Sequence, residues 1–327
     1  MNLLITGGAG FIGSNFIRMA VANGHRVVNF DALTYAGRRE NLADLESGSH
    51  YRFVRGSICD AEAVHSICTC EKFDALVNFA AESHVDRSIH AARVFSDTNV
   101  AGVATLLEAA RDAGIPTFVQ ISTDEVYGSL GANGTFSHDS PLDPSSPYSS
   151  TKAGADLLAL SFFKTWGYDV RITRCTNNYG AYQFPEKFIP TIITRAVRGQ
   201  QVPVYGDGLQ VRDWIYVDDH CRGIFKTIES GKPAGVYLFG GSSERTNLDL
   251  SRLILRHVAR KMGKDEEALL GLITHVTDRP GHDRRYAMDW SSSERTLGWR
   301  PETNFDTGIE RTVDWYLEHS AWWSEKL

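Results

Sequence analysis

The sequence predicts an α/β fold in which a doubly wound parallel sheet is joined to a second, smaller and discontinuous lobe. In the first half of the chain, short apolar or β-branched runs alternate with longer amphipathic stretches, a pattern typical of a parallel sheet with helices on both faces. After Arg174 this alternation gives way to short segments rich in glycine and aspartate. We therefore expect a sheet domain over residues 1–175, to which residues 211–240 return, and a smaller lobe formed mainly by residues 176–327.

Six apolar runs in the first half of the chain are expected to form the strands of the sheet. They are rich in aliphatic and β-branched side chains, as strands buried on both faces usually are. Beyond them, a proline-containing apolar stretch over residues 187–197 predicts a helix of the smaller lobe. The six predicted strands are residues 2–6, 26–30, 51–54, 75–79, 117–121 and 169–173.

Two helices of the sheet domain can be placed from the residues at their ends. Between the fourth and fifth strands, apolar residues from Val100 to Ala110 recur at helical spacing, and Gly114 follows them. Glycine is favoured just beyond a helix end, so we expect a crossover helix here. Ser146 suits the N-cap of a later helix and Pro147 its first turn.

The composition is that of a globular protein and argues against several classes of function. The 327 residues are 42% hydrophobic and 23% charged, and the formal charge is −6. Basic and acidic residues are interspersed, so no basic face points to nucleic acid or an anionic membrane. No apolar run reaches the roughly 18 residues that span a bilayer, and no signal-peptide pattern precedes the first strand. We expect a cytoplasmic protein with a small-molecule partner.

The five cysteines do not form a metal-binding pattern. Cys68 and Cys70 are close in the sequence, but the second pair or nearby histidine that a zinc site requires is missing. We therefore expect free thiols, as is usual in the cytosol, and no metal.

The first predicted strand ends in a glycine-rich turn. Residues 6–13 read Thr-Gly-Gly-Ala-Gly-Phe-Ile-Gly and lie between a strand and a helix. Such glycines let the backbone approach a pyrophosphate, which the helix N-terminus attracts through its free N–H groups and its dipole. Asp31 closes the second strand, where a carboxylate binds ribose hydroxyls and disfavours a 2′-phosphate. These features predict a Rossmann-type site for NAD.

Tyr148 and Lys152 are spaced to lie one helical turn apart on the same helix face. A nearby ammonium favours the phenolate, so we expect it to lower the pKa of the tyrosine and let it take a proton from a substrate hydroxyl. The alternative is an incidental surface pair, because this spacing is common.

The fifth predicted strand leads into Thr123, Asp124 and Glu125, which should lie at the carboxyl edge of the sheet, where ligands bind. Two adjacent carboxyl groups raise each other's proton affinity, and one of them can stay protonated near neutrality. This suggests separate acid and base roles, which simple dehydrogenation does not need. The alternative is a solvated turn.

With these motifs, and with the segments at residues 80–88, 122–128, 177–180 and 278–283, the chain closely resembles the dTDP-glucose 4,6-dehydratases. The resemblance extends nearly from end to end. These enzymes are extended short-chain dehydrogenases, and the acid pair after Thr123 separates them from the related sugar epimerases.

The resemblance implies a redox-neutral reaction that converts dTDP-glucose into dTDP-4-keto-6-deoxy-glucose. Tyr148 would remove the O4 proton while hydride passes from C4 to a tightly bound NAD, which is regenerated in each turnover. Glu125 would then take the C5 proton and Asp124 would protonate the departing C6 hydroxyl, after which hydride returns to C6. Thr123 would hydrogen-bond the O4 region, and Lys152 would assist Tyr148.

The resemblance also implies two sets of binding residues. The residues expected to contact NAD are Gly7, Gly10, Phe11, Ile12, Gly13, Asp31, Thr34, Ser57, Ile58, Ala80, Thr98, Tyr148, Lys152 and Asn178. The residues expected to contact the nucleotide sugar are Ser83, Thr123, Asn177, Lys187, Phe188, Pro203, Tyr205, Arg212, Asn247, Arg279 and His282. Ser57 stands where the family usually has an aspartate beside the adenine.

Two other functions stay open at this point. A UDP-sugar 4,6-dehydratase or decarboxylase would share the glycine turn and the tyrosine-lysine pair, whereas a non-catalytic NAD-binding protein would share only the fold. The resemblance further suggests a homodimer, with the helix after the fourth strand and the helix that begins at Tyr148 pairing across a two-fold axis.

Overall fold

A seven-stranded parallel sheet forms the centre of the computed structural model, which describes residues 1–278 and 280–324. Its strand order is β10-β6-β5-β4-β1-β2-β3, so the order reverses between β1 and β4. This confirms the doubly wound sheet and places the topological switch point beside β1. The strands are β1 (Asn2–Thr6), β2 (Arg26–Asp31), β3 (Tyr51–Arg55), β4 (Ala75–Asn78), β5 (Thr117–Thr123), β6 (Asp169–Cys175) and β10 (Val236–Phe239).

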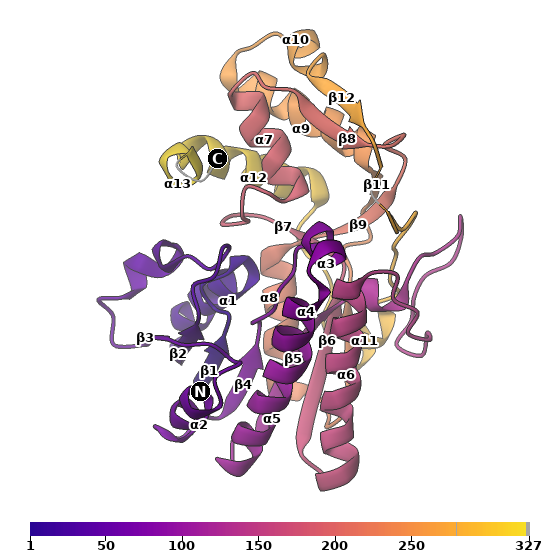
Figure 1. Ribbon diagram of the computed structural model, residues 1–327. Coiled ribbons are helices and arrows are strands. Elements are labelled where there is room, and N and C mark those ends of the chain that lie inside the picture. The colour runs from indigo at the N-terminus through magenta and orange to yellow at the C-terminus, as the bar shows by residue number, and fades with distance from the viewer. Residues whose placement is uncertain (279, 325–327) are drawn as a thin grey trace.

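Helices cover both faces of this sheet (Figure 1). One face packs against α2 (Ala61–Thr69), α5 (Gly102–Asp112) and α6 (Pro147–Trp166). The other packs against α1 (Phe11–Ala22) and α8 (Val217–Ser230). Because both faces are covered, side chains of either orientation on the strands are buried, which explains their continuous apolar runs.

The helix starts predicted from the sequence are largely confirmed. Ser146 caps α6 in a capping box with Ser149, Pro147 is its first residue, and the helix ends at Gly167 with φ +68°. The predicted crossover helix is α5, which stops before Gly114 at φ +72°. It is preceded by a π-helical turn over Asp97–Ala101, which the spacing of apolar residues did not predict.

The smaller lobe lies above the carboxyl ends of the sheet strands (Figure 1). It contains a three-stranded sheet, β11-β9-β7, a two-stranded sheet, β12-β8, and a separate apolar core. Its elements are β7 (Asn177–Tyr179), α7 (Phe188–Val197), β8 (Val202–Tyr205), β9 (Val211–Tyr216), β11 (Glu244–Thr246), α9 (Asn247–Met262), α10 (Glu266–Leu270), β12 (Ile273–Val276), α12 (Phe305–Glu318) and α13 (Ser320–Ser324).

The expected return of residues 211–240 to the main sheet is only partly right. β9 pairs with β7 and β11 in the small sheet instead. The return is made by α8, which packs on the main sheet, and by β10, which pairs with β6. The boundary after residue 175 therefore stays a prediction, because the chain crosses between the lobes more than once.

The remaining short elements connect these layers. The short elements are α3 (Val85–His90), α4 (Ala92–Ser96), α11 (Ser291–Leu297) and the 3-10 turns Arg39–Leu45 and Asp124–Tyr127.

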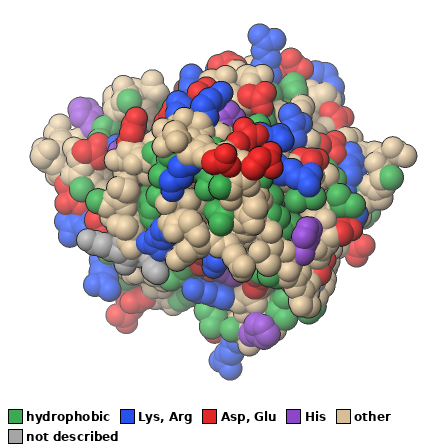
Figure 2. All heavy atoms as spheres, turned by 90° about the horizontal axis from the view of Figure 1, so that it is seen from above, with side chains coloured by type: hydrophobic (Ala, Val, Ile, Leu, Met, Phe, Trp, Pro, Cys, Tyr) green, Lys and Arg blue, Asp and Glu red, His purple; other side chains and the backbone are tan. Residues whose placement is uncertain are grey.

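The described residues show no membrane span and no disulfide. No helix among them is long and apolar enough to cross a membrane, and all five cysteines are free. Figure 2 shows basic and acidic side chains intermixed on the upper face.

Candidate active site

A cavity of about 360 Å³ lies along the carboxyl ends of the central strands, at the switch point. Its volume is within the usual range of small-molecule sites. Every residue that the sequence led us to expect at NAD lines this cavity, and so do Thr123, Asp124 and Glu125. The structure thus brings together the glycine turn, the acid pair and the tyrosine-lysine pair, which are far apart in the sequence.

The glycine turn leaves room for a ligand at the N-terminus of α1. Gly7 has φ +70°, which favours glycine. A Cβ on Gly13 would lie 2.6 Å from the carbonyl oxygen of Gly7. Gly10 is the N-cap of α1 and offers no capping side chain. This backbone cradle therefore fits the pyrophosphate of a dinucleotide.

The Asp31 carboxylate is held in place by the backbone at the end of β2. It accepts hydrogen bonds from the N–H groups of Ala9 at 2.9 Å and Leu33 at 2.7 Å. Burial raises the pKa of Asp31, and these two bonds oppose that shift. Each oxygen keeps further lone pairs for ribose hydroxyls.

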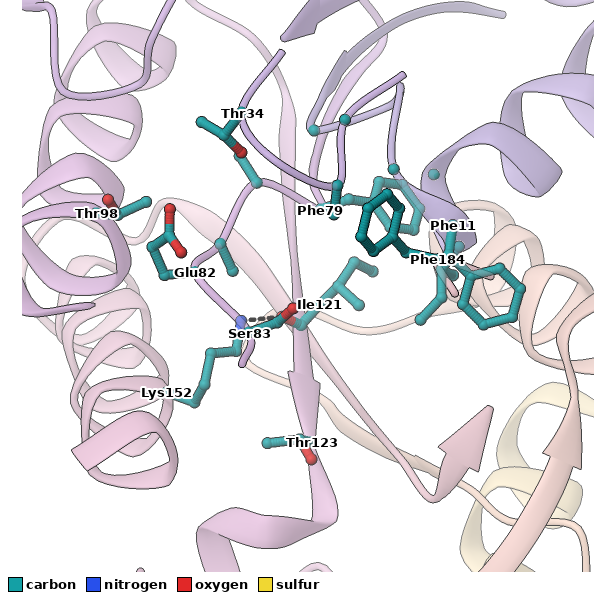
Figure 3. Close-up of a pocket in the computed structure, with 18 of the residues that line it drawn as sticks. Phe11, Thr34, Phe79, Glu82, Ser83, Thr98, Ile121, Thr123, Lys152 and Phe184 are labelled. Atoms are coloured by element: carbon teal, nitrogen blue, oxygen red, sulfur yellow. Dashed lines mark hydrogen bonds between the residues drawn. The ribbon is translucent and has the colours of Figure 1, made fainter. Parts of the chain in front are cut away.

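The surroundings of Tyr148 and Lys152 do not favour the low tyrosine pKa that was expected from the sequence. Both side chains are buried on α6, but the Lys152 Nζ donates to the carbonyl oxygen of Ile121 at 2.6 Å (Figure 3). Burial raises the pKa of Tyr148 well above its ordinary value, and Glu125 adds to the shift. Burial also lowers the pKa of Lys152. In the protein alone, burial and the neighbouring carboxylates therefore act against the expected lowering of the tyrosine pKa.

Thr123 joins the tyrosine to the acid pair. It lines the cavity together with Tyr148, whose pKa its hydroxyl tends to lower, and its Oγ1 donates to the Oδ1 of Asp124 at 3.2 Å. It also caps the short turn that follows β5 by accepting the N–H of Glu125 at 3.3 Å. Tyr148, Thr123 and Asp124 therefore face one cavity, and Thr123 is hydrogen-bonded to the acid.

Asp124 is placed to remain protonated. Its side chain is 2% exposed, and its Oδ2 has no hydrogen-bond partner among the described residues. Burial raises the pKa of Asp124 well above its ordinary value, Glu125 raises it further, and Arg212 opposes the shift. A neutral carboxyl group in this position can supply a proton.

The residues expected to contact the nucleotide sugar fall into two groups. Ser83, Asn177 and Lys187 line the cavity together with Thr123, and the Lys187 Nζ donates to the Ser83 carbonyl oxygen at 3.1 Å. Arg279 lies outside the described residues. The described residues that the structure does not bring to the cavity are Phe188, Pro203, Tyr205, Arg212, Asn247 and His282.

The second group has contacts of its own in the smaller lobe. The Arg212 guanidinium lies 4.2 Å from the centre of the Tyr286 ring and donates to the Asp283 carbonyl oxygen at 2.9 Å. Tyr205 and His282 form an edge-to-face ring pair at 6.2 Å. Whether these side chains meet the sugar nucleotide stays a prediction.

Several residues that line the cavity were not anticipated. They include Cys175, at the carboxyl end of β6, and Glu82, in the loop after β4. Both residues lie at or just beyond the carboxyl end of a parallel strand. Because these strand ends meet at one edge of the sheet, their positions in the sequence could have indicated that they line the site. Other unanticipated lining residues are Tyr35, Thr176, Gln183 and Phe184.

The fold and the site define a class of enzyme. A doubly wound sheet, a glycine turn at its first helix and a tyrosine-lysine pair on the helix after β5 are the features of an extended short-chain dehydrogenase. The chain belongs to the GDP-mannose 4,6 dehydratase family, whose model matches residues 4–312.

Curated relatives are similar over almost the whole chain. It is 49% identical to a dTDP-glucose 4,6-dehydratase of Xanthomonas campestris, over 98% of this chain and 94% of the relative. It is 47% identical to a dTDP-glucose 4,6-dehydratase of Streptomyces niveus, over 99% of this chain and 95% of the relative.

Solved structures of similar proteins share the fold throughout. DesIV, a dTDP-glucose 4,6-dehydratase of Streptomyces venezuelae solved with NAD and TYD bound, has a TM-score of 0.93 and 47% identity, with all of both chains covered. A dTDP-glucose 4,6-dehydratase of Bacillus anthracis solved with NAD has a TM-score of 0.90 and 42% identity, again with full coverage.

Proposed function

We propose that this protein converts dTDP-glucose into dTDP-4-keto-6-deoxy-glucose, with NAD as a tightly bound cofactor. The observation that carries the proposal is that Tyr148, Thr123 and Asp124 line one cavity and that Thr123 is hydrogen-bonded to Asp124, which brings an oxidation site and an acid together. The names of the relatives support the substrate, and the NAD in the solved dehydratase structures supports the cofactor.

The residues around the cavity fit a dinucleotide. The backbone cradle at Gly7 and Gly13 admits a pyrophosphate, and Asp31 faces the same cavity with lone pairs available for a ribose. When bound, NAD would accept a hydride from C4 of the sugar and return it to C6. Ser57 lines the same cavity and offers a hydroxyl near the expected adenine end.

The protein side chains would manage the protons. Tyr148 would take the proton of the sugar O4, with Thr123 holding that oxygen in place, so that C4 becomes a ketone. The ketone acidifies the C5–H bond, and Glu125 would remove that proton and later give a proton back to C5 when hydride adds to C6. Asp124, kept neutral by burial, would give its proton to the C6 hydroxyl, which leaves as water. Loss of an unactivated hydroxyl needs both of these roles.

Two wider features belong to the same proposal. The five free thiols are consistent with a reducing, cytoplasmic location. A homodimer would be formed through α5 and α6, and α6 carries the exposed apolar side chain of Leu157.

Turnover without added cofactor provides the test. Purified protein is incubated with dTDP-glucose, and the product is followed by its alkali-induced absorbance and by the mass loss of one water. We expect product without net formation of NADH. Turnover of UDP-glucose in place of dTDP-glucose would move the assignment to a UDP-sugar enzyme, and inactivity with both sugars, even with NAD added, would overturn the enzymatic proposal.

A further inference from the structure

A buried histidine lies directly behind the wall of the cavity. His220 is in the first turn of α8 and its side chain is fully buried. Its Nδ1 lies 3.0 Å from the Oδ1 of Asn178, and Asn178 lines the cavity. His220 itself does not line the cavity and has no role in the mechanism proposed above.

The hydrogen-bond partners of Asn178 determine the positions of the nitrogen and the oxygen of its side-chain amide. The amide nitrogen lies 3.0 Å from the carbonyl oxygen of Thr176 and 3.2 Å from the Cys175 Sγ. A carbonyl oxygen can only accept, so the nitrogen must face Thr176 and the Oδ1 must face His220. The Oδ1 accepts, and therefore the Nδ1 of His220 must carry a hydrogen.

The other ring nitrogen of His220 lacks a hydrogen. Burial lowers the pKa of His220 to about 3, so the ring is neutral and carries a single proton. Its Nε2 has no hydrogen-bond partner within the described part of the chain, and the ring lies 5.8 Å from the ring of Phe239. An unpaired buried acceptor destabilises a protein, and an apolar side chain here would avoid that cost.

We propose that His220, as the tautomer protonated on Nδ1, is a positioning residue that holds the Asn178 amide in the cavity wall for the bound dinucleotide. The observation behind this is the single orientation that Thr176 imposes on the amide. The proposal rests on the NAD binding proposed above, because it concerns the residues that face that ligand.

These contacts also determine which hydrogen-bonding group of Asn178 is still available to a ligand. Both hydrogens of its amide nitrogen are directed at Thr176 and Cys175, and one lone pair of its Oδ1 is used by His220. The second lone pair of the Oδ1 remains. A ligand group that meets this amide from the cavity must therefore be a hydrogen-bond donor, as the carboxamide nitrogen of nicotinamide is.

Two substitutions of His220 separate positioning from packing. In His220→Asn the new amide nitrogen occupies the place of Nδ1 and keeps the donor, whereas His220→Leu fills similar space without a donor. We expect His220→Leu to weaken NAD binding about fivefold to tenfold, the usual effect of one lost buried hydrogen bond, and His220→Asn to restore most of it.

A double-mutant cycle ties the effect to Asn178. In an Asn178→Ala background, His220→Leu should no longer change the NAD dissociation constant, because the group that it positions is gone. Thr227→Val is the matched control, since Thr227 is a buried α8 residue whose hydroxyl, among the described residues, bonds only to the Gly223 carbonyl oxygen. It should lower stability and leave NAD binding unchanged. Equal loss of binding from His220→Leu in both backgrounds, or none in the parent, would overturn the proposal.

A measurement on the parent protein tests the tautomer without any variant. Nitrogen NMR of histidine-labelled protein, with His220 assigned from His220→Asn, should show a neutral ring protonated on Nδ1 that does not titrate between about pH 5 and 8. Protonation on Nε2, or titration near neutrality, would contradict the proposal whether or not the enzyme acts on dTDP-glucose. Failure of the parent protein to bind NAD would instead count against the proposed function.

Discussion

Asp124 and Tyr148 are both buried at the cavity that Thr123 also lines, and burial raises the pKa of both acids. Each group therefore holds its proton more tightly in the protein alone than it would in water. For Asp124 this is the state needed by an acid that protonates a leaving hydroxyl. For Tyr148 it is the opposite of the state needed by a base, so something that binds must change it.

Replacing Asp124 by asparagine should separate catalysis from stability. Asparagine cannot supply a proton, so turnover should fall about 100-fold or more, and the step that loses water should slow most. In stopped-flow measurements the reduced cofactor formed by C4 oxidation should accumulate. Turnover at the parent rate would show that Asp124 is not the acid.

The same variant should alter the pH dependence of folding. The pKa of Asp124 is raised in the folded state from an unfolded value near 3.8, so the folded protein holds a proton that the unfolded chain has lost. The free energy of unfolding of the parent should therefore fall as pH rises from about 3.8 through the raised pKa. Asp124→Asn should lack that slope in urea titrations and be the more stable protein at neutral pH.

Binding of NAD should lower the pKa of Tyr148. The nicotinamide ring of oxidised NAD is cationic, and a cation near the phenol favours the phenolate, so we expect the pKa of Tyr148 to decrease when NAD binds. Difference absorbance of the phenolate, taken between the parent and Tyr148→Phe, measures it with and without NAD. Tyr148→Phe should also lose activity about 100-fold or more. An equal phenol titration in both states would contradict this account of base activation.

At the scale of single elements, the start of α6 holds the tyrosine in the site. Ser146 and Ser149 exchange capping hydrogen bonds in the turn that contains Tyr148. Ser146→Ala should lower the free energy of unfolding by about 1 kcal/mol. It should also reduce turnover, because the first turn of α6 would fray beside Thr123.

A second helix cap supplies the control for Ser146→Ala. Asp265 caps α10 by accepting the N–H of Ala268 at 2.7 Å, and α10 lies at the far end of the smaller lobe (Figure 1). Asp265→Ala should cost similar stability without changing turnover. If both variants leave turnover unchanged in steady-state assays, the capped turn does not position Tyr148.

The ends of the six strands predicted from the sequence are correct to within two residues, and the two largest differences fall at the site, whereas β10 was not predicted as a separate strand. β5 extends to Thr123 and β6 to Cys175, each two residues beyond the predicted end. Thr123 and Cys175 are partners in the parallel register. The apolar pattern stops before these residues, but pairing with the neighbouring strand continues, and only the assembled sheet supplies that neighbour.

At the scale of the molecule, the position of the glycine turn and Asp31 at the cavity was predictable from the sequence, whereas the contacts within the smaller lobe were not. The glycine turn and Asp31 belong to one local βαβ unit, whose chemistry follows from its spacing. Tyr205 and His282 come together through the pairing of β8 with β12, which are distant in the sequence. No periodicity reports such a contact, so the resemblance alone suggested those residues.

The main-sheet helices leave apolar side chains on the outer surface, which argues for a second copy of the chain. Leu157 on α6 is 58% exposed and Val94 on α4 is 51% exposed, and these two helices are in contact with each other. Analytical ultracentrifugation of the parent should give twice the mass of the chain. Leu157→Lys should raise the dimer dissociation constant about tenfold or more, because burying a leucine contributes roughly 1.5–3 kcal/mol and each 1.4 kcal/mol is about a factor of ten.

An exposed leucine elsewhere makes the control for this surface. Leu209 is 45% exposed and lies between β8 and β9 of the smaller lobe. Leu209→Lys should leave the sedimentation of the dimer unchanged, because that lobe is not expected to meet the partner. If the parent sediments as a monomer at micromolar concentration, or if Leu157→Lys and Leu209→Lys behave alike, the surface formed by α6 and by α4, which leads through the π-helical turn into α5, is not the interface. The apolar side chains on it are then exposed in the working enzyme.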